Sequence, residues 1–237
     1  KKLLVEQIDK DHIFYMYEQS YRCWALWFDW RDFNRIKFVE LICKKLHNKN
    51  PEIFLNIFKL ITKSLHDNRA ILELQFENKD ATFNSLFNIY KSYYENEFKM
   101  WSTPIVAYIL EEYHWTKIWK KSIVKKLWSA EEYFNIWSSK KLQWIDNDKI
   151  GFKWMWDDIN KVLRNAWWGH NSYEITDEWL CTLNNIDPNN WKVKGTITYS
   201  YDDIENEIKK IEKLLLILEL WIDIFICNNP DVKKGVI

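Results

Sequence analysis

Apolar residues recur every three or four positions along most of the chain, and this spacing predicts a mainly helical protein. The segments that show it are residues 33–47, 52–66, 82–99, 104–113, 116–127 and 130–137. Asn50-Pro51 separates the first two and places proline at a helix start, where its missing N–H is not needed. We therefore expect an all-α fold, built as a helical bundle.

The spacing of the apolar residues changes in the C-terminal third of the chain. Asp157-Asp158 is expected to open a helix, because acidic residues are favourable in a first turn, and a brief helix is expected near 177–184. Residues 192–199 alternate apolar and polar side chains, which is typical of a strand. We expect this strand to pair with 172–176 as a small β-hairpin.

A long C-terminal helix is expected to begin at Asp202-Asp203. Its apolar stripe consists of Ile204, Ile208, Ile211, Leu215, Leu218, Ile222 and Phe225. A polar stretch between 138 and 150 marks a soft boundary. It divides a helical N-terminal region, 1–140, from a C-terminal region, 150–237, although one continuous helical domain fits the pattern too.

The charge balance excludes some classes of partner. The 237 residues carry 34 Lys and Arg against 34 Asp and Glu, so the net charge is zero. A strongly basic coat for nucleic acid is therefore excluded, and any such binding needs a local patch. The longest apolar run, 214–226, is interrupted by Glu219 and Asp223 and is too short and too charged to span a bilayer.

The cysteines favour a reducing compartment. Cys23, Cys43, Cys181 and Cys227 are scattered and form no CxxC pair, so we expect reduced, mostly buried thiols and a cytoplasmic location. Cys43 and His47 have a spacing that could share a metal, but no second ligand pair accompanies them, and we expect no metal or cofactor. No signal peptide opens the chain, and its start at Lys1 rather than Met indicates a fragment or a processed form.

Tryptophan is abnormally frequent and glycine abnormally rare, with 16 Trp against 4 Gly. Trp128 directly precedes a Ser-x-x-Glu capping pattern, where a helix end favours glycine. Trp191 follows Asn190 before a strand, where a hairpin favours Asn-Gly, and Trp167-Trp168 precedes Gly169. Two interpretations stay open: the protein is genuinely rich in tryptophan, or some UGA codons are read as glycine in the source organism.

One segment suggests chemistry. It runs Leu-Arg-Asn-Ala-Trp-Trp-Gly-His-Asn-Ser-Tyr-Glu-Ile over residues 163–175, with five residues between Arg164 and His170. On a continuous helix these two side chains would lie roughly 120° apart. Gly169 can take a positive φ and end the helix, which would let His170 fold back toward Arg164.

This segment resembles the HEPN family, the higher-eukaryote and prokaryote nucleotide-binding helical domains, whose ribonucleases carry an Arg, a polar residue, a short gap and a His. The resemblance implies metal-independent RNA cleavage with the 2′-hydroxyl as nucleophile, at a cleft between two protomers of a homodimer. Arg164 would hold the phosphate, His170 would transfer a proton, and Asn165 would either fix the backbone turn or hydrogen-bond the substrate. A toxin branch carries a Tyr two residues beyond the His, whereas Tyr173 lies three beyond His170. We expect Tyr173 to bind the RNA substrate.

Lysines supply further candidates for RNA binding. Lys121 and Lys125 alternate with tryptophans and could follow an RNA backbone, and Lys161 lies just before the motif. A solvated helix face explains the same lysines. For the motif itself, the structural alternative is a solvated Arg164 and a capping His170.

We therefore expect a HEPN-type endoribonuclease that works in defence, as a toxin or in RNA processing, with RNA and a second copy of the chain as partners and no membrane. The alternative is a non-catalytic helical module whose N-terminal helices bind a protein or an RNA.

Overall fold

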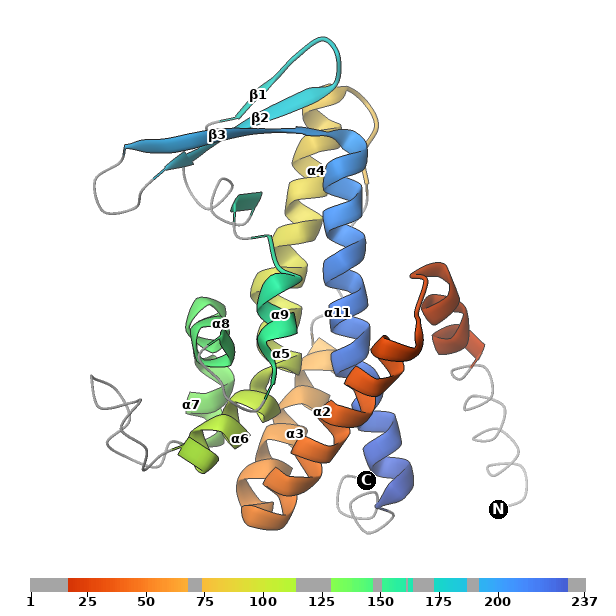
Figure 1. Ribbon diagram of the computed structural model, residues 1–237, viewed down its shortest axis with the longest axis vertical. Helices are drawn as coiled ribbons and strands as arrows, with labels where there is room; N and C mark the ends of the chain where they lie inside the picture. Colours follow the sequence, from red (N-terminus) through yellow and green to blue (C-terminus); the bar gives the residue numbers. More distant parts are fainter. Residues whose placement is uncertain are drawn as a thin grey trace.

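The computed structural model describes residues 17–67, 74–113, 129–146, 151–160, 162–163, 173–186 and 192–229 (Figure 1). Residues 17–25 are helical, and the elements that follow are α2 (Trp30–Lys49), α3 (Pro51–Asp67), α4 (Lys79–Ser92), η1 (Tyr93–Glu97), α5 (Phe98–Trp101), α6 (Thr103–Tyr113), α7 (Ala130–Asn135), α8 (Ser138–Asp146), α9 (Lys153–Asp157), β1 (Tyr173–Ile175), β2 (Leu180–Ile186), β3 (Val193–Ser200) and α11 (Tyr201–Asn228). The expected fold class is confirmed: the protein is mainly α-helical, with a small antiparallel sheet before a long C-terminal helix.

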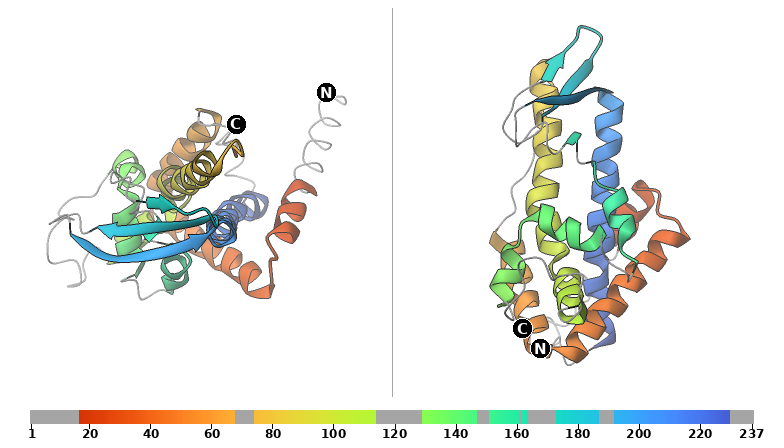
Figure 2. Two further views of the ribbon diagram at one scale, coloured as in Figure 1. Left: turned by 90° about the horizontal axis from the view of Figure 1, so that it is seen from above. Right: turned by 60° about the vertical axis from the view of Figure 1, so that its left-hand side comes forward.

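The molecule is elongated along two helices. α4 and α11 pack together and lead to the sheet at one end, while α2, α3 and α6 gather at the other end (Figures 1 and 2). α11 begins at a capping box, in which the Ser200 side chain accepts from the Asp203 N–H and the Asp203 side chain accepts from the Ser200 N–H. Its middle residues, Leu214 to Leu218, are all buried, so this helix is enclosed on every side there.

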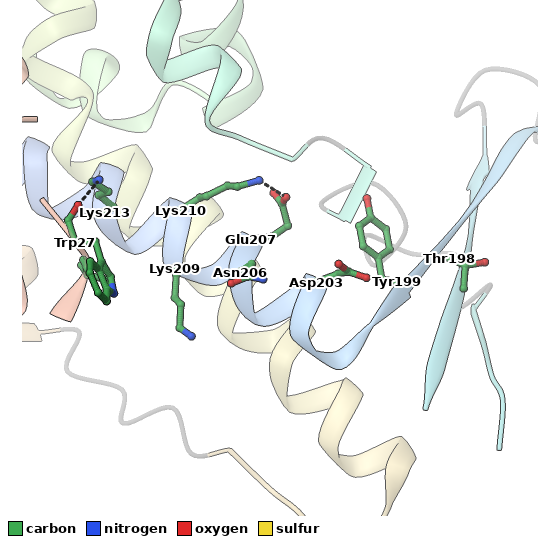
Figure 3. Close-up of a pocket in the computed structure, with 10 residues that line it drawn as sticks. Trp27, Thr198, Tyr199, Asp203, Asn206, Glu207, Lys209, Lys210 and Lys213 are labelled. Atoms are coloured by element: carbon green, nitrogen blue, oxygen red, sulfur yellow. Dashed lines mark hydrogen bonds and ion pairs between the residues drawn. The ribbon is translucent and has the colours of Figure 1, made fainter. Parts of the chain in front are cut away.

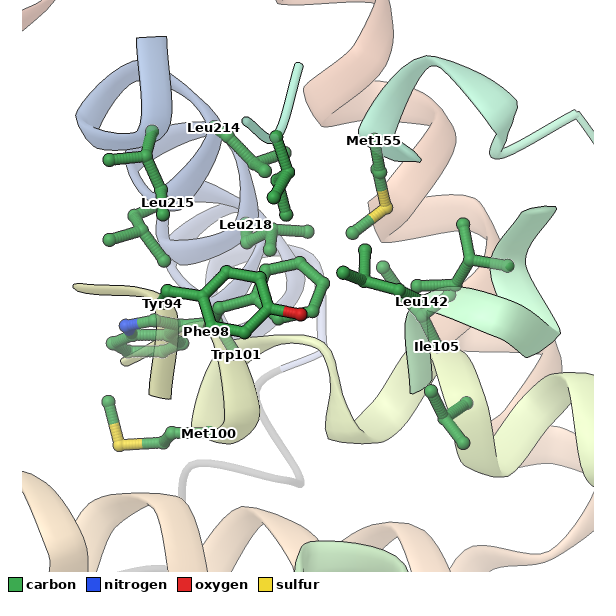
Figure 4. Packing of buried hydrophobic residues seen from close by; sticks show 14 of the residues in the cluster. Tyr94, Phe98, Met100, Trp101, Ile105, Leu142, Met155, Leu214, Leu215 and Leu218 are labelled. Atoms are coloured by element: carbon green, nitrogen blue, oxygen red, sulfur yellow. The ribbon is translucent and has the colours of Figure 1, made fainter. Parts of the chain in front are cut away.

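The apolar core joins both predicted regions. Tyr94 and Phe98 pack near Leu214 and Leu218 of α11, and Met155 of α9 closes the same cluster (Figure 4). The polar stretch where a boundary is expected, from Ser138 to Asp146, is helix α8, which packs against α6 and α9.

Three expectations about individual elements are wrong. Residues 180–186 form strand β2 rather than part of a helix at 177–184, and β2 lies between β1 and β3. The segment 192–199 therefore does not pair with 172–176; each pairs with β2 instead. Asp157 is the last residue of α9, not the first of a new helix.

The long helix expected at 82–99 contains a change of winding. α4 ends at Ser92, a π-helical turn follows over Tyr93–Glu97, and α5 begins at Phe98. The Phe98 N–H donates to the Tyr93 carbonyl, five residues back. Such turns insert one residue into a helix and re-aim the side chains around it. The helix expected at 116–127 lies outside the described residues.

Two tryptophans adopt the left-handed backbone conformation that favours glycine. Trp27 has φ 56° and Trp179 has φ 59°, and they are the non-glycine residues with positive φ in the part of the chain that the structure describes. Trp27 ends helix 17–25 in a Schellman motif: its N–H donates to the Trp24 carbonyl, and the Phe28 N–H donates to the Cys23 carbonyl. Glycine is the usual residue at this position.

Trp179 is the third residue of a three-residue hairpin loop. The Thr176 N–H donates to the Leu180 carbonyl at 2.8 Å, and the Trp179 N–H donates to the Thr176 carbonyl at 3.2 Å. A loop of this kind is a type I turn followed by a left-handed residue, again most often glycine. By contrast, Trp221 is 0% exposed in the core, where a glycine would leave a large void.

Candidate functional site

Most of the predicted site residues lie outside the described residues. These are Arg164, Asn165, His170, Lys161, Lys121 and Lys125. The same holds for Trp128, Trp167, Trp168 and Trp191. Tyr173 is described, and so are the residues that flank the motif on both sides, 151–160 with 162–163 before it and β1 after it.

Asn160 fixes the chain directly before the motif. Its N–H donates to the Tyr90 hydroxyl at 2.8 Å, and the same hydroxyl donates to the Asn160 carbonyl at 3.1 Å. Its side-chain amide donates to the Tyr199 hydroxyl at 3.0 Å. One residue therefore joins the end of the α9 region to α4 and to β3.

The side-chain oxygen of Asn160 caps the helical turn that follows. Its Oδ1 accepts from the N–H groups of Val162 and Leu163 at 3.0 and 3.1 Å, which is the arrangement of a helix N-cap. Leu163 is buried, so the turn is held by packing as well. The described chain therefore enters the motif from a fixed position.

Tyr173, three residues beyond His170, fixes the chain on the other side of the Arg164–His170 pair. Its hydroxyl donates to Asn84 Oδ1 of α4 at 2.6 Å, and its ring lies 5.7 Å from that of Phe87. The predicted substrate-binding residue is thus half-buried, and its hydroxyl is engaged with α4. Asn84 and Tyr90 are six positions apart, about 9 Å along a helix axis, so both flanks of the motif are tied to one stretch of α4.

Burial raises the pKa of the three tyrosines in these anchors. It raises the pKa of Tyr90 far above its ordinary value, and it raises the pKa of Tyr199 and Tyr173 as well. All three hydroxyls therefore keep their protons at neutral pH. They act as neutral hydrogen-bonding groups rather than as bases.

A groove with several charged side chains in its wall runs along α11. It has a volume of about 690 Å³ and extends from Trp27 to Thr198 and Tyr199 of β3 (Figure 3). The wall between them carries Lys209, Lys210, Lys213, Asn206, Asp203 and Glu207. Tyr199, whose hydroxyl accepts from the Asn160 side chain, is one of the residues that line this groove.

The lysines of the groove are paired with acids. Lys210 contacts Glu207 at 2.6 Å, and Lys213 contacts Asp32 at 2.6 Å while also donating to the Trp27 carbonyl. Lys209 pairs with Glu205 at 3.0 Å. The groove therefore offers donors and acceptors of both signs rather than a strongly basic surface.

No metal chemistry emerges from the described part of the chain. Within it, no group of three His, Cys, Asp or Glu side chains is placed to hold a metal ion. Cys43 is buried, which raises the pKa of its thiol, and His47 packs its ring against Phe54 and Phe225. This pair is thus a packing feature in the core. None of the described helices, α11 included, is at once long enough and apolar enough to cross a membrane.

Sequence reasoning did not find the anchor residues. Tyr90 falls within the apolar helical segment 82–99, and Asn160 falls within the helix expected to open at Asp157-Asp158, so neither stands out. The residue type of Asn160 is the feature of the sequence that points to its role. Asn is a typical helix N-cap, and here it lies two and three positions before the apolar pair Val162-Leu163.

Comparison of the chain with protein-family models, with curated proteins and with solved structures gives no significant match.

Proposed function

We propose that the protein is a HEPN-type endoribonuclease that cleaves RNA without a metal ion, acts as a homodimer in the cytoplasm and works in defence, as a toxin or in RNA processing. The resemblance of residues 163–175 to the family's motif is the basis of the proposal. The observation that supports it best is that Asn160, four residues before Arg164, and Tyr173, three residues after His170, are both tied to α4. A catalytic segment needs such fixed ends, because catalysis depends on positioning.

The proposed chemistry needs one guanidinium and one imidazole from each copy. Arg164 binds the scissile phosphate with two parallel hydrogen bonds. His170 takes or gives a proton as the ribose 2′-oxygen attacks phosphorus and the 5′-oxygen leaves, and Asn165 supports the turn between them. The products are a 2′,3′-cyclic phosphate and a 5′-hydroxyl. Because Tyr173 holds Asn84, we assign it to the scaffold rather than to RNA contact.

Lysines near the motif are proposed to bind the RNA backbone. Lys161, Lys121 and Lys125 remain candidates from the sequence. The groove on α11 adds Lys209 and Lys210 beside the Asn160 anchor. Because these two lysines have acidic partners, we expect each to contribute little and the salt dependence of binding to be shallow.

The test is incubation of the purified protein with single-stranded RNA in EDTA, beside His170→Ala and Arg164→Ala. We expect cleavage by the wild type, loss of cleavage in both variants, and no cleavage of an all-DNA strand of the same sequence. Lys44→Ala, on the exposed surface of α2, is the matched control and should cleave normally. Equal cleavage by wild type and His170→Ala would rule out the site.

A second candidate function is a non-catalytic interaction module. Exposed aromatic side chains favour it: Trp24 and Phe33 are exposed and line an apolar groove that helix 17–25 forms with α2 and α11. Tight RNA or protein binding without any cleavage would support this module, whereas EDTA-resistant cleavage would support the enzyme.

A further inference from the structure

Strand β3 forms an edge of the sheet. The strand order is β1-β2-β3, and β2 pairs with β3 from Leu180 opposite Ser200 to Ile186 opposite Val193. Among the residues that the structure describes, no strand pairs with the other side of β3. Such an edge presents a row of N–H and C=O groups that can pair with a further strand.

β3 also carries apolar side chains that the fold leaves uncovered. Ile197 lies opposite Leu183, and opposite residues of an antiparallel pair share a face of the sheet. Leu183 is 2% exposed, but Ile197 is 38% and Val193 is 56% exposed. In Figure 1 the start of β3 extends beyond α4 and α11, the two helices that reach the sheet. Apolar surface of this kind favours a partner.

The two ends of β3 differ in charge. Lys192 precedes the strand, and Asp202 and Asp203 follow it in the first turn of α11. In an antiparallel pair of identical strands, the start of one strand lies beside the end of the other. Lys192 of each copy would then approach the acidic turn of the other copy, which favours self-pairing over a partner of a single charge.

We propose that the free edge of β3 is a self-association surface on which a second copy of this chain docks by antiparallel β3–β3 pairing, with the two-fold axis near Ile197. A two-fold interface uses the same patch on both copies. β3 meets this condition, because each copy offers an open edge, uncovered apolar side chains and both signs of charge. This inference rests on the proposed function only in that the proposed enzyme needs a homodimer; its evidence lies in β3 and α11.

The dimer is expected to be weak. One added strand pair covers less surface than the roughly 1,200–2,000 Å² of a stable interface. Sedimentation velocity from low to several hundred micromolar protein should therefore show a monomer that converts to a dimer. A monomer at every concentration would overturn the inference, as would a monomer that binds an unrelated extended peptide along β3.

Cross-linking tests the position of the axis. In a Cys227→Ser background, which removes the exposed native thiol, Ile197→Cys should oxidise to a covalent dimer. Directly opposite Cα atoms of antiparallel strands lie about 4.5–5.5 Å apart, within disulfide range. Val193→Cys is the matched control, because its two copies would be about eight strand residues, or roughly 26 Å, apart. Equal cross-linking of both variants, or of neither, contradicts the proposed pairing.

A charge swap tests the ends of the strands. Lys192→Glu and Asp202→Lys should each weaken dimerisation several-fold, and the double variant should restore it, because each contact is then an opposite-charge pair again. Thermal melting of each variant reports whether the fold is intact. Failure of the double variant to recover, with an unchanged melting temperature, refutes the inference.

The outcomes separate this inference from the proposed function. A β3-dependent dimer that does not cleave RNA refutes the nuclease alone. RNA cleavage by a dimer that Ile197→Cys does not cross-link and the charge swap does not affect refutes the β3 surface alone.

Discussion

The backbone N–H of Asn160 donates to the hydroxyl of Tyr90, and the same hydroxyl donates back to the Asn160 carbonyl. A single phenol thus satisfies both backbone groups of the residue that precedes the predicted motif. Tyr90 is 2% exposed, so no water can readily take its place.

Tyr90→Phe should therefore destabilise the protein by about 1–3 kcal/mol, the cost of leaving buried polar groups without a partner. Urea denaturation gives the free energy of unfolding. Tyr21→Phe is the control, because Tyr21 is exposed and should change stability by only a few tenths of a kcal/mol. Equal effects at the two positions would show that the Asn160 contact contributes nothing.

Stability should depend on pH through Glu97 at the π-helical turn. Burial raises the pKa of Glu97 to about 7, with repulsion from Glu219 and Glu212 adding and Arg22 opposing. The folded state then binds more protons than the unfolded state between the ordinary Glu pKa and about 7, so stability falls as pH rises through this window. Urea midpoints at pH 5.5 and 8 measure the loss.

Glu97→Gln should remove most of this loss and raise the urea midpoint at pH 8. Some pH dependence of the stability should remain in this variant, because burial raises the pKa of Glu219 too. Glu205→Gln, on the exposed side of α11, is the control and should keep the wild-type pH profile. A profile that Glu97→Gln leaves unchanged would assign the dependence to another group.

Trp27→Gly should stabilise the protein by about 1 kcal/mol. Trp27 is 86% exposed and left-handed, a conformation that is costly for any residue with a Cβ. The bond from Lys213 to the residue 27 carbonyl survives the change, because it uses the backbone. Trp24→Gly is the control: Trp24 is exposed but helical, and glycine there should destabilise by about 1 kcal/mol.

Trp27 and Trp179, the two left-handed tryptophans, test the codon interpretation of the tryptophan excess. If UGA is read as glycine, peptides of the natural protein that cover residues 27 and 179 should show glycine by mass spectrometry, whereas Trp221 should remain tryptophan. Tryptophan at residues 27 and 179 would show that the protein is genuinely rich in tryptophan.

Local patterns predicted most helices well. The apolar period and the Asn50-Pro51 break place α2 and α3 within a few residues of their bounds, and the Ser129-x-x-Glu132 pattern is the capping box that begins α7. Asp202-Asp203 likewise marks the first turn of α11. These features depend on neighbouring residues alone, which is why a single sequence is enough to find them.

The sheet was harder to predict, for two physical reasons. β2 lies between β1 and β3, and side-chain contacts with both neighbouring strands, rather than an intrinsic preference of its own residues, make this segment a strand. Its hairpin turn also hides its signature, because Trp179 stands at the left-handed position where glycine would signal a turn. The change to π-helical winding at Tyr93–Glu97 leaves no trace in the apolar period either.

We propose that RNA is cut by its own 2′-hydroxyl with Arg164 and His170 as the acting groups. Analysis of the RNA ends after incubation in EDTA tests this proposal most directly. We expect fragments that end in a 2′,3′-cyclic phosphate with the wild type and intact RNA with His170→Ala. Fragments that end in a 3′-hydroxyl, or identical fragments from both proteins, would contradict it.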